Sequence, residues 1–198
     1  MTNILVLYYS SNGATESLAR QVCAGVDSIE NAAAVLRTVP SVSTVCESTE
    51  NLIPSNGPPY VNKKDLANCS GLIMGSPTYF GNMAAPLKYF LDSTSSEWLS
   101  GVLADKPAGF FTSSSSPHGG QESTLLSMAI PLLHHGMIIV GIPYTLKAIS
   151  TTKSGGGPYG ASHITWNRDT EELTNEEKEV AQAIGKRVTQ IAKKLILK

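Results

Sequence analysis

Ile4-Leu5-Val6-Leu7-Tyr8-Tyr9 opens the chain and leads into Ser10-Ser11-Asn12-Gly13-Ala14-Thr15, and the fold follows from these two segments. The first segment predicts a strand buried on both faces, because it shows no alternation of apolar and polar residues. Beyond the loop, Leu18, Val22 and Val26 lie at a helical spacing. A small polar loop between a strand and a helix favours anion binding, because a helix N-terminus presents unpaired amides and a partial positive charge.

The loop Ser10–Thr15 holds hydroxyl groups, one side-chain amide and one glycine, but no Lys or Arg. A triphosphate site is typically G-x-x-x-x-G-K-[ST] and a dinucleotide site G-x-G-x-x-G, and this loop carries neither pattern. It therefore favours the phosphate of a mononucleotide held by neutral donors, of which FMN is the common example. The alternative is an ordinary turn whose serine caps the helix.

Composition excludes several classes of protein. A length of 198 residues fits one domain over residues 1–198, and a net charge of −1 argues against nucleic-acid binding, which needs a basic face. Cys23, Cys46 and Cys69 form no C-x-x-C pair, so we expect a reduced, cytoplasmic protein without a metal site. The apolar run after Met1-Thr2-Asn3 is too short for a signal peptide or a membrane span.

Strands and helical patterns alternate along the rest of the chain. Further strands are predicted at 33–39, 71–75, 107–112 and 137–140, and residues 161–166 extend the sheet. This alternation predicts a flavodoxin-like α/β fold, with a five-stranded parallel sheet in the order 2-1-3-4-5 and helices on both faces. The last helix is indicated by a capping box, Thr174 with Glu177, and by an apolar stripe that begins at Val180.

Three local expectations concern single residues. Asn82 is expected to cap the helix that follows it, with Pro86 tolerated in the first turn. Pro131 is expected to kink or end its helix. His163 is expected at the surface of a strand.

Three loops rich in small polar residues follow strands one, three and four. They are Ser10–Thr15, Ser76–Asn82 and Ser113–Gln121. Because ligands bind beyond the carboxyl ends of such strands, we expect the three loops to converge on one site. The long segments 40–63 and 141–160 are predicted to be functional or interfacial, with a plain surface excursion as the alternative.

Several motifs resemble one known family. Gly75-Ser76-Pro77-Thr78-Tyr79-Phe80-Gly81-Asn82-Met83 resembles the G-[ST]-P-T-[RY]-[FY]-G-N-M signature of WrbA-type NAD(P)H:quinone oxidoreductases. Further matches follow in family order: Phe90-Leu91-Asp92, Trp98 with Ser100-Gly101, Gly119-Gly120-Gln121-Glu122, His134-His135-Gly136-Met137 and Gly157-Pro158-Tyr159-Gly160-Ala161. The resemblance covers nearly the whole chain.

The resemblance implies subunits that bind FMN, take a hydride from NADH or NADPH, and reduce quinones by two electrons in a ping-pong scheme. It also implies homodimers or homotetramers, with the active site near subunit contacts. The FMN-binding residues that it implies are Ser10, Ser11, Asn12, Gly13, Ala14, Thr15, Pro77, Thr78, Tyr79, Phe80, Gly81, Asn82, Ser113, Ser114, Ser115, Ser116, Pro117, His118, Gly119 and His134.

Two of the implied roles have alternatives. His134 matches the family's flavin-site histidine, and a histidine at a helix end is the alternative. Trp98 matches an aromatic residue of the substrate pocket, and simple packing is the alternative. Asn12 departs from the aromatic residue that relatives often place against nicotinamide, so the preference between NADH and NADPH stays open.

Two other functions remain open at this stage. One is a flavodoxin-type one-electron carrier, although such carriers are usually shorter and strongly acidic. The other is a flavin-binding regulatory or interaction module.

Overall fold

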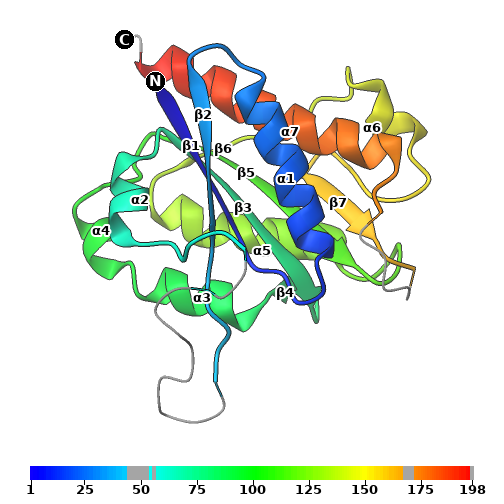
Figure 1. Cartoon of the computed structure of the whole chain (residues 1–198), viewed down its shortest axis with the longest axis horizontal. Coiled ribbons are helices and arrows are strands. Elements are labelled where there is room, and N and C mark those ends of the chain that lie inside the picture. Colours follow the sequence, from blue (N-terminus) through cyan, green and yellow to red (C-terminus); the bar gives the residue numbers. More distant parts are fainter. Residues whose placement is uncertain (44–53, 55–56, 167–171, 197–198) are drawn as a thin grey trace.

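The apolar run at the start of the chain forms β1 (Thr2–Tyr8) in the middle of a parallel sheet. The computed structural model describes residues 1–43, 54, 57–166 and 172–196. Strand β1 pairs with β2 (Ala32–Thr38) on one side and β3 (Gly71–Tyr79) on the other. Next to β3 come β5 (Pro107–Ser114) and β6 (Ile138–Ile139), giving the order β2-β1-β3-β5-β6 (Figure 1). In order along the chain this is the expected 2-1-3-4-5 arrangement, which is confirmed.

Within the described residues, the sheet contains seven strands rather than the five that we expected. Strand β4 (Asn82–Met83) is antiparallel to the end of β3. Strand β7 (Ala161–Ile164) pairs in parallel with β5, further along the same side on which β6 pairs. The fifth position of the sheet is therefore shared by two short strands, β6 and β7.

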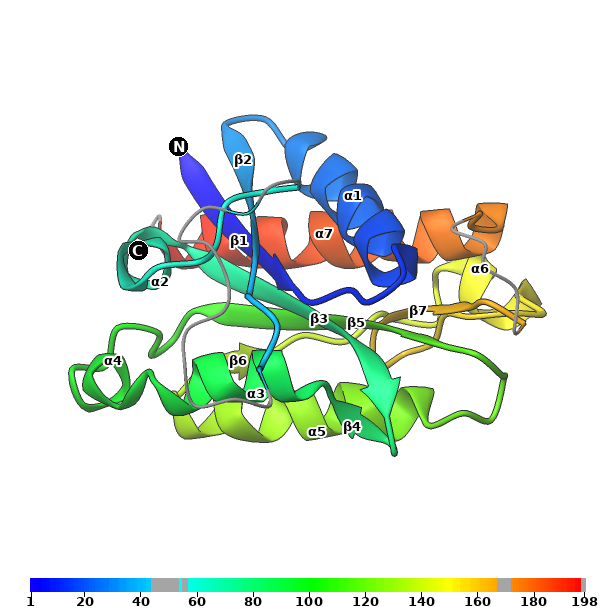
Figure 2. The same ribbon diagram turned by 60° about the horizontal axis from the view of Figure 1, so that its bottom comes forward.

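Helices cover both faces of the sheet (Figures 1 and 2). On one face, α1 (Ala14–Asp27), α6 (Lys147–Thr151) and α7 (Asn175–Ile196) enclose a core that includes Val6, Leu18 and Val188. On the other face, α2 (Lys63–Asn68), α3 (Ala85–Asp92) and α5 (Gln121–His134) enclose a second core that includes Leu7, Leu87 and Met128. The short helix α4 (Ser95–Leu99) follows α3. No helix in the described ranges is long and apolar enough to cross a membrane.

The second polar loop is shorter than the sequence predicts, because β3 continues to Tyr79. Phe80 and Gly81 then turn the chain with φ angles of 52° and 75°, as in the tight turns that join antiparallel strands. The expectation that Asn82 caps a helix is wrong, because Asn82 lies in β4 and its Oδ1 accepts a hydrogen bond from the Met83 amide. Helix α3 instead starts after Ala84, with Pro86 in its first turn as predicted.

Other local expectations fare differently. Helix α5 continues past Pro131 to His134, and Leu132 directly after the proline is fully buried. The capping box is confirmed, since the Thr174 amide donates to Glu177 Oε2 (2.9 Å) and the Glu177 amide donates to Thr174 Oγ1 (3.2 Å). Segment 141–160 contains α6, while half of segment 40–63, Cys46 included, lies outside the described residues.

Candidate functional site

A cavity of about 210 Å³ lies where the three polar loops meet, beyond the carboxyl ends of β1, β3 and β5. Residues from all three loops form its wall. They are Ser10, Ser11, Asn12, Ala14, Thr15, Pro77, Thr78, Tyr79, Ser113, Ser114 and Ser115, together with Thr165. We call this cavity the cradle.

The N-terminus of α1 opens into the cradle without a side-chain cap. Its N-cap residue is Gly13, in the left-handed region at φ 83°, and no side chain bonds to the first amides of the helix. The alternative of an N-capping serine is therefore wrong. These amides remain available to an anion.

Ser10 supplies a second sign of a ligand site. Its Oγ is buried and has no hydrogen-bond partner among the described residues. A buried hydroxyl group without a partner is destabilising, so such groups are rare in folded proteins. A phosphate oxygen in the cradle would satisfy this hydroxyl, and the residues present therefore fit the phosphate of FMN.

Hydroxyl contacts tie the first loop to the other two. Thr15 Oγ1 lies 2.8 Å from Ser113 Oγ, and this pair is buried. Ser11 Oγ lies 3.0 Å from the Tyr79 hydroxyl at the exposed rim. The three loops thus form one connected wall.

The second loop packs closely on the start of α5. Thr124 Oγ1 donates to Thr78 Oγ1 (2.7 Å), and a Cβ atom on Gly120 would lie 2.9 Å from the Gly81 Cα. This approach requires glycine at 120, where φ is 92°. The contact leaves Tyr79 half exposed and Phe80 fully exposed beside the cradle.

Thr165 is a cradle residue that sequence reasoning missed. Its amide donates to Ser114 O (2.9 Å), which fixes it against the third loop. The available signal was the predicted extension of the sheet at 161–166, since the carboxyl end of a parallel strand there falls at the same edge. The other predicted residues of the three loops lie outside the cavity wall: Gly13, Phe80, Gly81, Asn82, Ser116, Pro117, His118 and Gly119.

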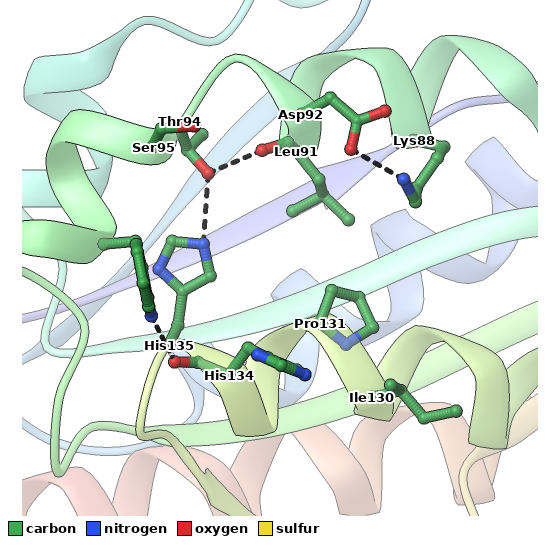
Figure 3. A pocket seen from close by; sticks show the side chains of 10 residues that line it. Lys88, Leu91, Asp92, Thr94, Ser95, Ile130, Pro131, His134 and His135 are labelled. Atoms are coloured by element: carbon green, nitrogen blue, oxygen red, sulfur yellow. Dashed lines mark hydrogen bonds and ion pairs between the residues drawn. The ribbon is translucent and has the colours of Figure 1, made fainter.

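His134 and Trp98 lie far from the cradle of their own chain. Helix α5 starts beside the second and third loops and ends at His134, and fourteen helical residues span about 20 Å. Figure 3 shows His134 and Pro131 at this distant end, across a separate cavity of about 420 Å³ from Leu91 and Thr94. Trp98 lines the same cavity, and its Nε1 donates to His134 O (2.7 Å).

His135 lines this distant cavity. Burial lowers its pKa below the ordinary value of 6.5. Thr94 Oγ1 donates to Leu91 O (2.7 Å) and therefore accepts from His135 Nε2 (3.0 Å), as Figure 3 shows. The histidine thus holds Thr94 in place at the wall of the cavity.

His163 is not at the surface, and that expectation is wrong. Its side chain is 2% exposed, and its Nδ1 lies 2.9 Å from the Oε2 of the fully buried Glu177. Burial alone would raise the pKa of Glu177, but hydrogen bonds from His163, Ser154 and Thr174 outweigh it and lower the pKa to about 2. The described part of the chain holds no group of three or more His, Cys, Asp or Glu side chains able to bind a metal.

Comparison with known proteins gives matches over most of the chain. The family described as NADPH-dependent FMN reductase matches residues 2–149. An NAD(P)H dehydrogenase (quinone) of Syntrophobacter fumaroxidans is 40% identical over 199 residues, covering 97% of this chain and 98% of that protein. A protein of the same name from Geobacter sulfurreducens is 40% identical over 200 residues, covering 98% of each.

Solved structures agree with these matches at the level of the fold. A WrbA-like flavodoxin from Agrobacterium tumefaciens superposes with a TM-score of 0.68 at 23% identity, covering 98% of this chain and 99% of that one. The resemblance drawn from the ordered motifs is confirmed. From the matched residues 2–149 and the two relatives at 40% identity, the chain belongs to the NADPH-dependent FMN reductase family.

Proposed function

We propose that this chain is an FMN-dependent NAD(P)H:quinone oxidoreductase that reduces quinones by two electrons. The observation that carries the proposal is the cradle, in which the partnerless Ser10 hydroxyl lies beside the uncapped amides of α1. The two relatives at 40% identity, both named NAD(P)H dehydrogenase (quinone), support the reaction. When bound, FMN supplies a hydride acceptor and donor, chemistry that no protein side chain provides.

The cradle residues bind and orient the cofactor. Ser10, Thr15 and the first amides of α1 hold the phosphate with neutral donors and the positive end of the helix dipole. Residues 77–82 and 113–119 would hold the ring system, the second of these segments mostly through backbone groups. Amides between Thr78 and Phe80 would donate to the ring edge, where donors favour the electron-rich form of the ring.

The two substrates use one site in turn, which gives ping-pong kinetics. The exposed Tyr79 and Phe80 border the open side of the cradle, where both substrates bind. Parallel double-reciprocal lines with NADH and benzoquinone are expected. Intersecting lines would count against this order of events.

His134 and Trp98 reach a cradle only through a second copy of the chain. An apolar stripe on α5 is open to solvent, with exposed fractions of 49% for Leu126, 60% for Ile130 and 58% for Leu133. If two copies pack these stripes about a twofold axis perpendicular to the helix, their α5 helices run antiparallel. The His134 end of one copy then lies beside the α5 start, and hence the cradle, of the second copy.

The proposed assembly is thus a homodimer or a homotetramer built from such pairs. An imidazole in this position can donate a hydrogen bond to a substrate oxygen, and the Trp98 ring gives the substrate an apolar wall. We place the protein in the cytoplasm, which the free thiols of Cys23 and Cys69 support.

One cuvette tests the activity. FMN is added to the purified chain without oxygen and unbound FMN is removed, and then NADH and benzoquinone are added in sequence. The visible absorbance of the bound flavin should fall with NADH and return with benzoquinone. A chain that binds FMN but is not reduced by NADH would be a one-electron carrier, and a chain that binds no FMN would be an interaction module.

Mixing two inactive variants tests the shared site. Ser10→Asp repels a phosphate from the cradle, and His134→Ala removes the imidazole. In a mixed dimer, one cradle is intact and receives an intact His134 from the other copy, so activity should return. If both groups acted within one chain, the mixture would stay inactive.

A further inference from the structure

Gln121, the first residue of α5, joins the third loop to β7. Its side chain is buried, and its Nε2 donates to Ser114 Oγ (2.8 Å) and to His163 O (3.4 Å). Its Oε1 accepts from Ser162 Oγ (2.8 Å). Gln121 is not among the residues that line the cradle.

Ser114 passes this constraint to the third loop. Because Ser114 Oγ accepts from Gln121, its own proton is directed to Ser116 O, at 2.8 Å. The carbonyl of Ser114 is held on its other side by the Thr165 amide. Ser114 therefore has one orientation, and it presents that orientation to the cradle wall.

Strand β7 is in turn anchored by the buried carboxylate of Glu177, at the start of α7. Oε2 accepts from His163 Nδ1 and from the Thr174 amide, both at 2.9 Å. Oε1 accepts from Ser154 Oγ (2.6 Å), the Gly155 amide (3.0 Å) and the Ile164 amide (3.3 Å). The anchor thus comes from the helix layer on the opposite face of the sheet from α5.

We propose that Gln121 is a positioning residue for FMN and that it acts through Ser114. Glu177 in turn fixes β7, the strand that holds Gln121 through Ser162 and His163. Gln121 makes no contact with the cofactor. It sets the direction of the Ser114 side chain and the shape of residues 114–116, of which Ser114 and Ser115 line the cradle. This inference rests on the proposed function, because FMN is the ligand of the third loop there.

The first test replaces Gln121 with methionine, which has similar length and no polar group. Because three buried hydrogen bonds are lost, we expect the FMN dissociation constant to rise about tenfold. In the chain without FMN, the amides of residues 114–116 should exchange hydrogen faster, and those of the first loop should not. Thr189→Val is the matched control, since it removes a buried hydroxyl bond to Gly185 O within α7 and should leave FMN binding unchanged.

A double-mutant cycle separates positioning from general destabilisation. If Gln121 acts through Ser114, adding Gln121→Met to Ser114→Ala should weaken FMN binding by less than about twofold more. A merely structural role would make the two effects multiply. Multiplied effects, or Gln121→Met with unchanged FMN affinity and unchanged exchange, would overturn the inference.

Failure of the proposed function is a separate result. It would appear as an unsubstituted chain that binds no FMN. The role of Gln121 would still be decided by exchange in the chain without cofactor. Faster exchange at 114–116 in Gln121→Met would support it, and unchanged exchange would overturn it.

Discussion

The Ser10 hydroxyl has opposite effects on the empty and the loaded protein. Without ligand it is buried and has no partner in the part of the chain that the structure describes, so Ser10→Ala should raise the free energy of unfolding by about 1 kcal/mol. With FMN the same hydroxyl is a phosphate donor, so the variant should bind FMN about tenfold more weakly. Denaturant unfolding and a fluorescence titration measure the two quantities. A variant that is less stable and binds FMN unchanged would place the hydroxyl outside the phosphate site.

Phe80 is held in a strained backbone conformation without burial to offset it. Its φ of 52° is unusual for a bulky residue, and its side chain is fully exposed in a single copy. Phe80→Asn creates the Asn-Gly pair favoured in this turn and should raise the free energy of unfolding by about 1 kcal/mol. Turnover with benzoquinone should fall, because the aromatic border of the cradle is lost. Met83, in the same hairpin but 8% exposed, offers a contrast, since Met83→Ala should destabilise the fold.

Glu177 makes the free energy of unfolding depend on pH in the acid range. Its pKa in the folded chain is about 2, below the ordinary 4.5, so ionised Glu177 stabilises the fold above pH 4.5 and this contribution is lost as pH falls toward 2. Glu177→Gln should cost about 3 kcal/mol at neutral pH, because a buried charged partner is removed. Its unfolding free energy should also fall less steeply between pH 4.5 and 2 than that of the unsubstituted chain. Parallel slopes for the two proteins would show that Glu177 is not the titrating group.

Some single residues could be placed from the sequence, whereas His163 and Asn82 could not. The polar cradle residues were predictable, because they follow buried strands at one edge of the sheet. His163 was not, since the short run Ala161–Ile164 gives no sign that a carboxylate from α7 lies behind it. The prediction that Asn82 caps a helix failed for a similar reason. The turn before it has Phe80 at a position of positive φ, where a glycine or asparagine would have indicated a hairpin.

Helix α5 carries an apolar face that a single copy leaves uncovered. Ile130 lies in the middle of the stripe formed with Leu126 and Leu133. Ile130→Glu should therefore shift the mass measured by light scattering toward that of one chain and lower the turnover with it. Ile196→Glu is the matched control, since Ile196 is a comparably exposed isoleucine (57%) at the end of α7. Loss of assembly in the control alone would place the interface elsewhere.

At the level of elements, long periodic segments were the most predictable. Helix α7 was marked by its capping box and its stripe, and both are present. The short elements were not predictable from local pattern. Strands β4 and β7 exist because β3 and β5 offer free edges to pair with, and this is a tertiary cause.

For the whole molecule, FMN should act as a stabilising ligand whose phosphate carries much of the effect. A ligand at one hundred times its dissociation constant stabilises the fold by about 2.7 kcal/mol, so the melting temperature should rise with FMN concentration. Riboflavin, which lacks the phosphate, should raise it much less at the same concentration. Equal shifts of the melting temperature for both compounds would show that the cradle does not bind the phosphate.

The strand order could be predicted from the alternation of strands and helices in the sequence. The distance between the cradle and His134 could not be predicted in this way. Motifs adjacent in family order can lie at opposite ends of one helix, as Gln121 and His134 do. The site residues and the single domain over residues 1–198 therefore stay predictions. The family membership is shown by matches over nearly the whole chain.

The division of one sheet position between β6 and β7 also leaves this edge of the sheet without a long strand. A long open strand edge is a template on which another chain can add a strand. Here β6 has two residues and β7 has four, and they are separated by the segment that contains α6. The outer side of β5 is thus covered in two pieces, neither of which is long enough to seed an intermolecular sheet.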